Sequence, residues 1–145
     1  MIAIIDYGAG NIFSVKNALD YLGLENRLVS DKESVISADA VILPGVGAFP
    51  AAMKKLEATG LVETIKNEAS KKPFLGICLG MQLIFEKGYE FGECDGLGLI
   101  KGDVRKMEAP ELIIPHMGWN KLEKLNDCRL MNGIGDNEYV YFVHS

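Results

Sequence analysis

The chain has 145 residues, of which 48% are apolar, and its 20 acidic and 15 basic side chains give a formal net charge of −5. This length suits one domain with its own core, so we expect a single domain spanning residues 1–145. The scattered basic residues argue against a nucleic-acid surface, and the lack of a long apolar run argues against a membrane-spanning segment.

Short apolar runs in the first half of the chain predict buried strands. Residues 2–5 and 40–43 are fully apolar, which is typical of parallel strands covered on both faces. Residues 25–29 suggest another strand between them, and residues 74–77 a further one. Because helical patterns separate these runs, the spacing predicts βαβ units and an α/β fold with a parallel central sheet flanked by helices.

The helical patterns carry recognisable start and stop signals. Asn11 suits the N-cap of a helix that Gly23 ends. Ser30 or Asp31 is expected to cap a short helical turn, and residues 50–71 are expected to be helical with a break near Thr59–Gly60. The residues expected on the apolar face of the first helix are Ile12, Val15, Ala18, Leu19 and Leu22.

The second half of the chain has a different pattern. After Lys87, glycines separate short alternating segments, which favours loops and antiparallel strands. The segment 114–120 is expected to be irregular and exposed, whereas residues 139–143 form a strong β-favouring run. Domains seldom end inside such a strand, so the sequence also leads us to expect a chain that is incomplete at its C-terminus.

The stretch from Lys72 to Gln82 holds the clearest chemical signal. An apolar strand runs into Cys78, which Gly76 and Gly80 flank at two-residue spacing, and a helical pattern follows. This is the arrangement of a nucleophile elbow with sulfur in place of oxygen. A helix N-terminus favours the thiolate, and the backbone N–H of Leu79 could stabilise an oxyanion. The alternative is an inert, buried thiol.

A second glycine-containing loop, Pro44–Phe49, follows the strand at residues 40–43. The loop is expected at the carboxyl edge of the sheet, where α/β proteins bind ligands. Its glycines would allow a backbone N–H to point toward an oxyanion, which the N–H of Leu79 would also contact. The pair Gly8 and Gly10 resembles a dinucleotide-binding turn. However, Phe13 replaces the third glycine and no acidic residue ends the second strand, so we expect no cofactor.

The remaining cysteines and histidines carry weaker signals. Cys94 and Cys128 are expected to be incidental, and the odd number of cysteines without C-x-x-C spacing argues for a reducing, cytoplasmic setting without a disulfide framework or zinc. Residues 1–5 lack the basic segment of a signal peptide. His116 could be a base or part of a partner-binding loop, and His144 is expected to be structural. The Asp and Glu residues are scattered and lack the clustered spacing of a metal site, so we expect no bound metal.

Four motifs in this order resemble the class I glutamine amidotransferases, and most closely the family of glutaminase subunits of imidazole glycerol phosphate synthase. The start of the chain, Asp6–Asn11, also fits that family. The segment Pro115–Asn120 narrows the resemblance to these subunits, and the resemblance covers the whole chain. The motifs are Pro44–Phe49, Gly76–Gln82, Pro115–Asn120 and Tyr141–Ser145.

The resemblance implies a flavodoxin-like fold and a role for each motif. Cys78 would attack the side-chain amide of L-glutamine and release ammonia through a γ-glutamyl thioester. Ammonia would pass to a separate cyclase subunit that makes imidazole glycerol phosphate and aminoimidazole carboxamide ribotide in histidine biosynthesis. The implied oxyanion hole is Val46, Gly47 and Leu79; the implied glutamine-binding residues are Gly47, Gln82 and Ser145; and the implied interface residues of this heterodimer are Asn11, Ser14, Met117 and Trp119.

One element of the family pattern has no counterpart in the chain. The family takes its base from a His-Pro-Glu motif downstream of the last strand, and neither His116 nor His144 matches it. We therefore expect the chain to be truncated before that motif and to have little glutaminase activity by itself, because losing a triad base removes most of the rate.

Two other functions stay open at this stage. An amidotransferase domain could serve another acceptor, as in anthranilate or guanylate synthesis, although such relatives are not expected to carry Pro115–Asn120. A non-catalytic, flavodoxin-like binding domain would instead keep Cys78 as a core thiol.

Overall fold

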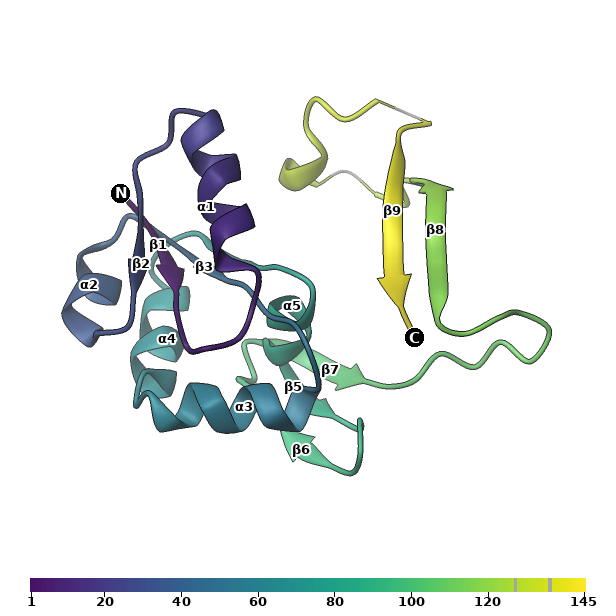
Figure 1. Ribbon diagram of the computed structural model, residues 1–145, viewed down its shortest axis with the longest axis horizontal. Coiled ribbons are helices and arrows are strands. Elements are labelled where there is room, and N and C mark those ends of the chain that lie inside the picture. The colour runs from purple at the N-terminus through teal and green to yellow at the C-terminus, as the bar shows by residue number, and fades with distance from the viewer. Residues whose placement is uncertain (127, 136) are drawn as a thin grey trace. The chain divides into compact units, whose positions relative to one another are not determined.

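The computed structural model describes residues 1–126, 128–135 and 137–145. The chain divides into two compact units, Met1–Arg105 and Lys106–Ser145, and each is described by itself. Figure 1 labels most of the helices and strands of both units. Among the described residues, no helix is long and apolar enough to cross a membrane.

A parallel sheet forms the centre of the first unit and confirms the predicted α/β fold (Figure 1). Its strand order is β2-β1-β3-β4, with β1 pairing with β2 and β3, and β3 pairing with β4, all in parallel. The register places Leu43 opposite Gly76, so the carboxyl ends of β3 and β4 are neighbours. The strands are β1 (Ile2–Ile5), β2 (Asn26–Val29), β3 (Ala40–Leu43) and β4 (Phe74–Gly76).

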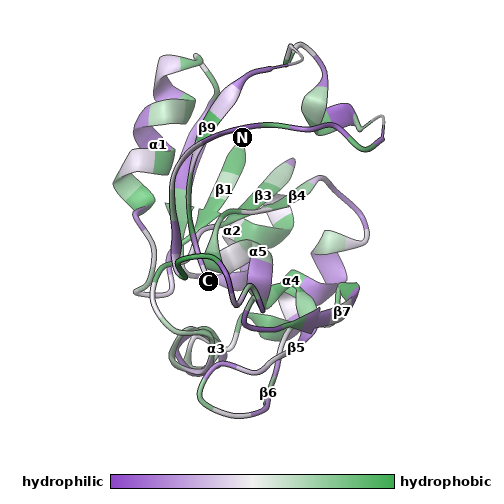
Figure 2. Ribbon diagram, turned by 90° about the vertical axis from the view of Figure 1, so that its right-hand side faces the viewer, coloured by the Kyte–Doolittle hydropathy of each residue, from purple (hydrophilic) through white to green (hydrophobic). Residues whose placement is uncertain are grey.

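The two faces of this sheet bury separate apolar clusters, because successive side chains of a strand point to opposite sides. Ile4 and Ile42 pack with Leu19 of helix α1 (Ile12–Tyr21). On the other face, Ile5 and Leu43 belong to the larger cluster, which the remaining helices complete. In Figure 2 the strands β1 and β3 are correspondingly green, the colour of hydrophobic residues. Helices therefore cover both faces, as a parallel sheet requires.

The helix caps follow the sequence signals. Asn11 Oδ1 accepts from Ser14 N–H at 3.3 Å at the start of α1, and Asp31 caps α2 (Lys32–Ser37) in the same way at 2.8 Å. The predicted break separates α3 (Phe49–Ala58) from α4 (Val62–Ala69). Gly23, which follows α1, has a φ of 70°, a conformation that glycine adopts without steric cost.

The predicted apolar face of α1 is broader than the one that the helix buries. Within this fully described helix, Leu19 is the one buried residue, and Ala18 is exposed. Leu22 follows the helix and is also exposed. The helix packs on a small apolar cluster whose buried sheet residues are Ile4 and Ile42, so it can bury only part of its own apolar face.

The region after the elbow departs from the prediction in one respect. Helix α5 (Leu79–Leu83) is followed by a sheet with the order β6-β5-β7. β6 pairs with β5 in antiparallel fashion as expected, but β7 pairs with β5 in parallel. The short strand β6 carries the chain back toward the start of β5, and β7 then runs in the direction of β5. The strands are β5 (Phe85–Gly88), β6 (Cys94–Asp95) and β7 (Ile100–Val104).

The second unit contains an antiparallel pair, β8 (His116–Lys121) and β9 (Tyr139–His144), and a 3-10 turn over Arg129–Met131. The strand β9 agrees with the predicted run over 139–143. The expectation of an irregular segment over 114–120 is wrong, because residues 116–121 pair in register with β9. Their partner lies more than a dozen residues away, and local sequence carries little information on such a pairing.

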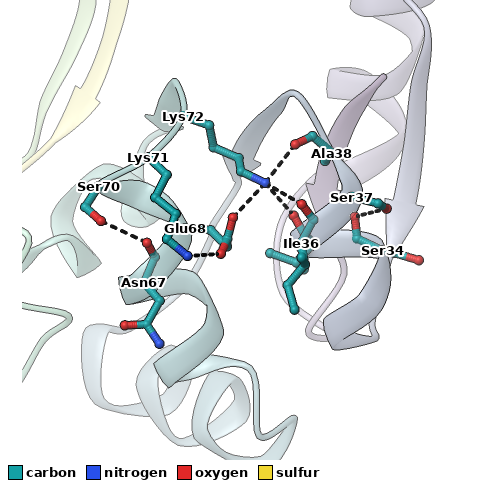
Figure 3. Close-up of polar contacts among 10 residues, drawn as sticks. Ser34, Ile36, Ser37, Ala38, Asn67, Glu68, Ser70, Lys71 and Lys72 are labelled. Atoms are coloured by element: carbon teal, nitrogen blue, oxygen red, sulfur yellow. Dashed lines mark hydrogen bonds and ion pairs between the residues drawn. The ribbon is translucent and has the colours of Figure 1, made fainter.

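A buried ion pair ties α2, α4 and the start of β4 together in the first unit. Glu68 of α4 is 6% exposed and lies 2.8 Å from Lys72 Nζ. The same ammonium donates to the carbonyls of Ile36 at 2.7 Å and Ala38 at 2.8 Å, at the end of α2 (Figure 3). Because both charges have several partners, the pair can be buried at an acceptable cost.

This ion pair predicts a pH-dependent stability. Hydrogen bonds from Lys71 and Lys72 hold the pKa of Glu68 below its ordinary value of 4.5. The stabilisation is therefore complete above pH 4.5 and is lost as the pH falls through the lowered pKa. We expect Glu68→Gln to lower the melting temperature at pH 7 and to have an effect that shrinks progressively as the pH is lowered below 4.5, as followed by circular dichroism. The exposed Glu63→Gln on the same helix is the control; an equal pH dependence in both variants would contradict the assignment.

Candidate active site

Cys78 lies between the end of β4 and the start of α5 (Leu79–Leu83), on a backbone that L-residues rarely adopt. Its φ is 55° and its ψ is −119°, outside the favoured regions. Such strain is retained only where the surrounding structure fixes it. The side chain is exposed and the cysteine is free, which disagrees with the alternative of a buried core thiol.

Two glycines allow the close backbone packing around Cys78, as the sequence predicts. A Cβ on Gly76 would lie 2.5 Å from the Cα of Met81, and a Cβ on Gly80 would lie 1.9 Å from the carbonyl oxygen of Leu43. Both atoms belong to the backbone, so no side-chain rotation could relieve the contact. The turn can form only because these two positions lack a Cβ.

The short helix α5 carries two further predicted site residues, Leu79 and Gln82. Leu79 is buried, and as the first helical residue it has a backbone N–H without an intrahelical acceptor. Gln82 is half-buried, and its backbone N–H donates to the carbonyl of Cys78 at 3.2 Å. Cys78, Leu79 and Gln82 are therefore held on one tight turn.

The loop between β3 and α3 packs against this turn. A Cβ on Gly45 would lie 2.5 Å from the nitrogen of Gly80, so the two backbones are in direct contact. Val46 is 53% exposed, and Gly47 has a φ of 95° with no atom near its missing Cβ. The structure thus brings the predicted loop and the elbow together, with Val46 and Gly47 at the surface.

Glu90, for which the sequence carries no signal, holds the far end of the same loop. Its carboxylate accepts from the backbone N–H of Phe49 at 2.8 Å, and a Cβ on Gly88 would lie 2.6 Å from the Phe49 ring. Glu90 comes from the connection between β5 and β6, which the sequence shows only as a polar, glycine-containing stretch. No local signal could have linked it to a loop 41 residues earlier.

Tyr7 was also missed. Its hydroxyl donates to the carbonyl of Pro44 at 2.8 Å in a buried contact, and desolvation raises the pKa of its phenol to about 12. The hydroxyl is therefore protonated at neutral pH and acts as a donor. The surrounding segment Asp6–Asn11 was recognised as a turn that fits the family, but nothing in it pointed to a contact of Tyr7 with Pro44.

Asn11 and Ser14 lie on this same segment, at the start of α1. Both residues are exposed, and the Asn11 side chain accepts from the backbone N–H of Ser14 in the N-cap contact. The predicted interface role of these two residues remains a prediction.

The other predicted site residues belong to the second unit. Met117 and Trp119 are 60% and 67% exposed, and the Trp119 ring contacts Tyr141 of β9 edge-on at 5.6 Å. Ser145 follows β9 and is exposed. These positions give the hairpin an exposed aromatic face.

His116 and His144 contact each other across the same hairpin. His116 Nδ1 lies 2.9 Å from His144 Nε2, and its Nε2 lies 2.7 Å from the side-chain nitrogen of Asn120. The His116 ring also stacks on Phe142. Both ring nitrogens of His116 thus have partners within the hairpin, which suits a structural role for this residue.

The remaining cysteines lie outside the elbow. Cys94 in β6 is half-buried, and desolvation raises the pKa of its thiol. Cys128 is exposed and precedes the 3-10 turn. Among residues 1–126, 128–135 and 137–145, no group of three His, Cys, Asp or Glu side chains is placed to hold a metal ion.

Comparison with known proteins agrees with the fold and the order of the motifs. Residues 3–145 match the family model described as glutamine amidotransferase class-I. Proteins named imidazole glycerol phosphate synthase subunit HisH from Bacillus thuringiensis subsp. konkukian and from Bacillus anthracis are each 55% identical over 146 residues, covering 100% of this chain and 69% of theirs.

A structural neighbour shows the same fold over nearly the whole chain. A crystal structure of a glutamine amidotransferase matches with a TM-score of 0.74 at 21% identity, covering 99% of this chain and 71% of that one. A putative peptidase E from Listeria monocytogenes matches less fully, with a TM-score of 0.50 at 19% identity over 59% of this chain and 50% of that one. From the family match and the 55% identity, the chain belongs to the class I glutamine amidotransferase family, among the HisH subunits of imidazole glycerol phosphate synthase.

Proposed function

We propose that this chain is the glutaminase subunit of an imidazole glycerol phosphate synthase and that Cys78 is its nucleophile. The observation that carries the proposal is the exposed Cys78 thiol on a backbone with φ of 55°, packed against a glycine loop. Strain of this kind is characteristic of functional sites. The 55% identity to HisH proteins supports the choice of pathway, histidine biosynthesis.

The proposed reaction hydrolyses L-glutamine to glutamate and ammonia. The Cys78 thiol gives its proton to water, its sulfur adds to the side-chain carbonyl carbon, and the carbonyl electron pair moves onto oxygen. Backbone N–H groups of Leu79 and of the Val46–Gly47 peptide would stabilise that oxyanion. The C–N bond then breaks, and the nitrogen takes up the proton and leaves as ammonia. Water adds to the resulting thioester, the C–S bond breaks, and glutamate and the thiol are released.

Substrate binding would use groups on both sides of the thiol. Gly47 lies on the loop and Gln82 on α5, and the role of the backbone near Ser145 of the second unit in binding glutamine stays a prediction. The proposed chemistry requires no cofactor, because the thiol forms the covalent intermediate and backbone N–H groups stabilise the charge. Free Cys78, Cys94 and Cys128 suit the reducing cytoplasm, where we place the protein.

The proposed partner is the cyclase subunit, which would receive the ammonia. Asn11, Ser14, Met117 and Trp119 would face it, and exposed Trp and Met side chains are enriched at such interfaces. Large aromatic side chains often dominate binding energy. Trp119 is therefore the residue whose loss should matter most.

Co-purification with the cyclase subunit tests this proposal. We expect a one-to-one complex at micromolar concentrations, and Trp119→Ala to weaken it about 30-fold, which corresponds to about 2 kcal/mol. Tyr21→Ala, at an exposed aromatic on α1 outside the proposed interface, is the matched control. Failure of the wild-type chain to bind the cyclase would reject the histidine assignment and favour an amidotransferase for another acceptor.

A further inference from the structure

We propose that Tyr7 is a positioning residue for the oxyanion loop Pro44–Phe49. By donating to the carbonyl of Pro44, its hydroxyl would fix the root of the loop against the Cys78 elbow. The inference rests on the proposed function, since loop position affects catalysis only if the loop stabilises an oxyanion.

The hydrogen bond is isolated from solvent. Tyr7 is 5% exposed, and Pro44 is among the fully buried side chains. Either group would lose solvation on burial without a partner, which costs free energy. Each therefore holds the other in place, and the carbonyl of Pro44 has a fixed direction.

The Pro44–Gly45 backbone is packed between two close contacts. On one side, a Cβ on Gly10 would lie 3.1 Å from the Pro44 Cβ and 3.3 Å from the Gly45 nitrogen. On the other side, a Cβ on Gly45 would lie 2.5 Å from the Gly80 nitrogen. The turn that carries Tyr7 thus packs against the loop root, and the loop root packs against the elbow.

Val46 and Gly47 follow this root directly and are exposed. The next anchor is Phe49, whose N–H donates to Glu90. Between the two anchors, the orientation of the Val46–Gly47 peptide depends on the dihedral angles at its ends. Loss of the Tyr7 hydroxyl would free the carbonyl of Pro44 to rotate, and small displacements of a catalytic donor reduce rates strongly.

Two thiol reagents distinguish a substitution that displaces the oxyanion loop from one that changes the reactivity of the Cys78 thiol. A chloromethyl ketone analogue of glutamine reacts when the thiolate adds to the ketone, which places an oxyanion on oxygen before chloride leaves. Iodoacetamide reacts by direct displacement of iodide and forms no such oxyanion. The ratio of the two rates at Cys78, measured by mass spectrometry on the full 145-residue chain, therefore reports the oxyanion loop.

In Tyr7→Phe we expect the ketone reaction to slow about 10-fold, less than the 10²–10³ loss for removing an oxyanion donor itself. The iodoacetamide rate should stay unchanged. Thr59→Val is the matched control: it also removes a hydroxyl, one that donates to the carbonyl of Leu56 at 2.6 Å away from the loop. It should leave both rates unchanged.

An unchanged rate ratio in Tyr7→Phe would overturn the inference while leaving the proposed function intact. If the ketone showed no preference for Cys78 in the wild-type chain, the proposed function itself would fail, and the inference with it. Replacing Tyr7 with p-aminophenylalanine keeps a weaker donor in place and guards against misfolding of Tyr7→Phe. Its ketone rate should lie between those of tyrosine and phenylalanine, and a rate no faster than that of phenylalanine would count against the proposal.

Discussion

Gly80→Ala is expected to destabilise the chain by about 3 kcal/mol, at the upper end of the usual cost of overpacking. The new Cβ would lie 1.9 Å from the Leu43 carbonyl oxygen and 2.7 Å from its carbonyl carbon. Both atoms belong to β3, whose Leu43 accepts from the backbone N–H of Ile77. To avoid this clash, β3 and the elbow would have to move apart, which would weaken the hydrogen bond from Ile77 to Leu43.

Urea denaturation of Gly80→Ala measures this cost, and alkylation of Cys78 measures its effect on the turn. Gly135→Ala is the matched control, because the nearest atom to its Cβ among the described residues would be Glu138 Oε1, at 3.1 Å and at the end of a flexible side chain. We expect the control to change stability by less than about 0.5 kcal/mol. A tolerated Gly80→Ala would mean that the elbow is not as tightly packed as the structure has it.

Two substitutions of Cys78 are expected to have the same effect on labelling but different effects on the free energy of unfolding. Both Cys78→Ala and Cys78→Gly remove the thiol, so both should abolish labelling by the glutamine analogue. They should differ in stability, because alanine keeps the strain at φ of 55° whereas glycine relieves it. We expect Cys78→Gly to be more stable than Cys78→Ala by about 1 kcal/mol, after allowance for the greater entropy of unfolded glycine.

Thermal and urea unfolding of the two variants decides this point. The opposite ranking is expected at an ordinary position, where alanine stabilises relative to glycine. A more stable Cys78→Ala would show that the backbone at residue 78 relaxes, and it would remove strain as evidence for a functional site.

The parallel sheet was predictable because each strand carries its own signal. Residues 2–5 and 40–43 are buried apolar runs, and Asn11 and Asp31 cap helices through side chains three residues from their partners. Likewise, the elbow motif lies within residues 76–80, and its glycines have a local reason to be there. Short-range chemistry of this kind can be recognised in a single sequence.

Contacts between distant residues were not predictable. The strand over 116–121 forms because it pairs with β9, and the parallel pairing of β5 with β7 depends on the intervening β6. Tyr7 and Glu90 contact the loop across 37 and 41 residues. A tyrosine in a turn and a glutamate in a loop have no local pattern that identifies these partners.

Selective labelling of Cys78 tests the central claim most directly. The 145-residue chain is incubated with the chloromethyl ketone analogue of glutamine, digested and analysed by mass spectrometry for modification at each cysteine. The proposed function predicts fast labelling at Cys78, slow labelling at Cys94 and Cys128, and protection of Cys78 by L-glutamine but not by L-asparagine. Equal labelling of the three cysteines, or labelling of Cys78 that glutamine does not slow, would contradict its role as the nucleophile of a glutaminase.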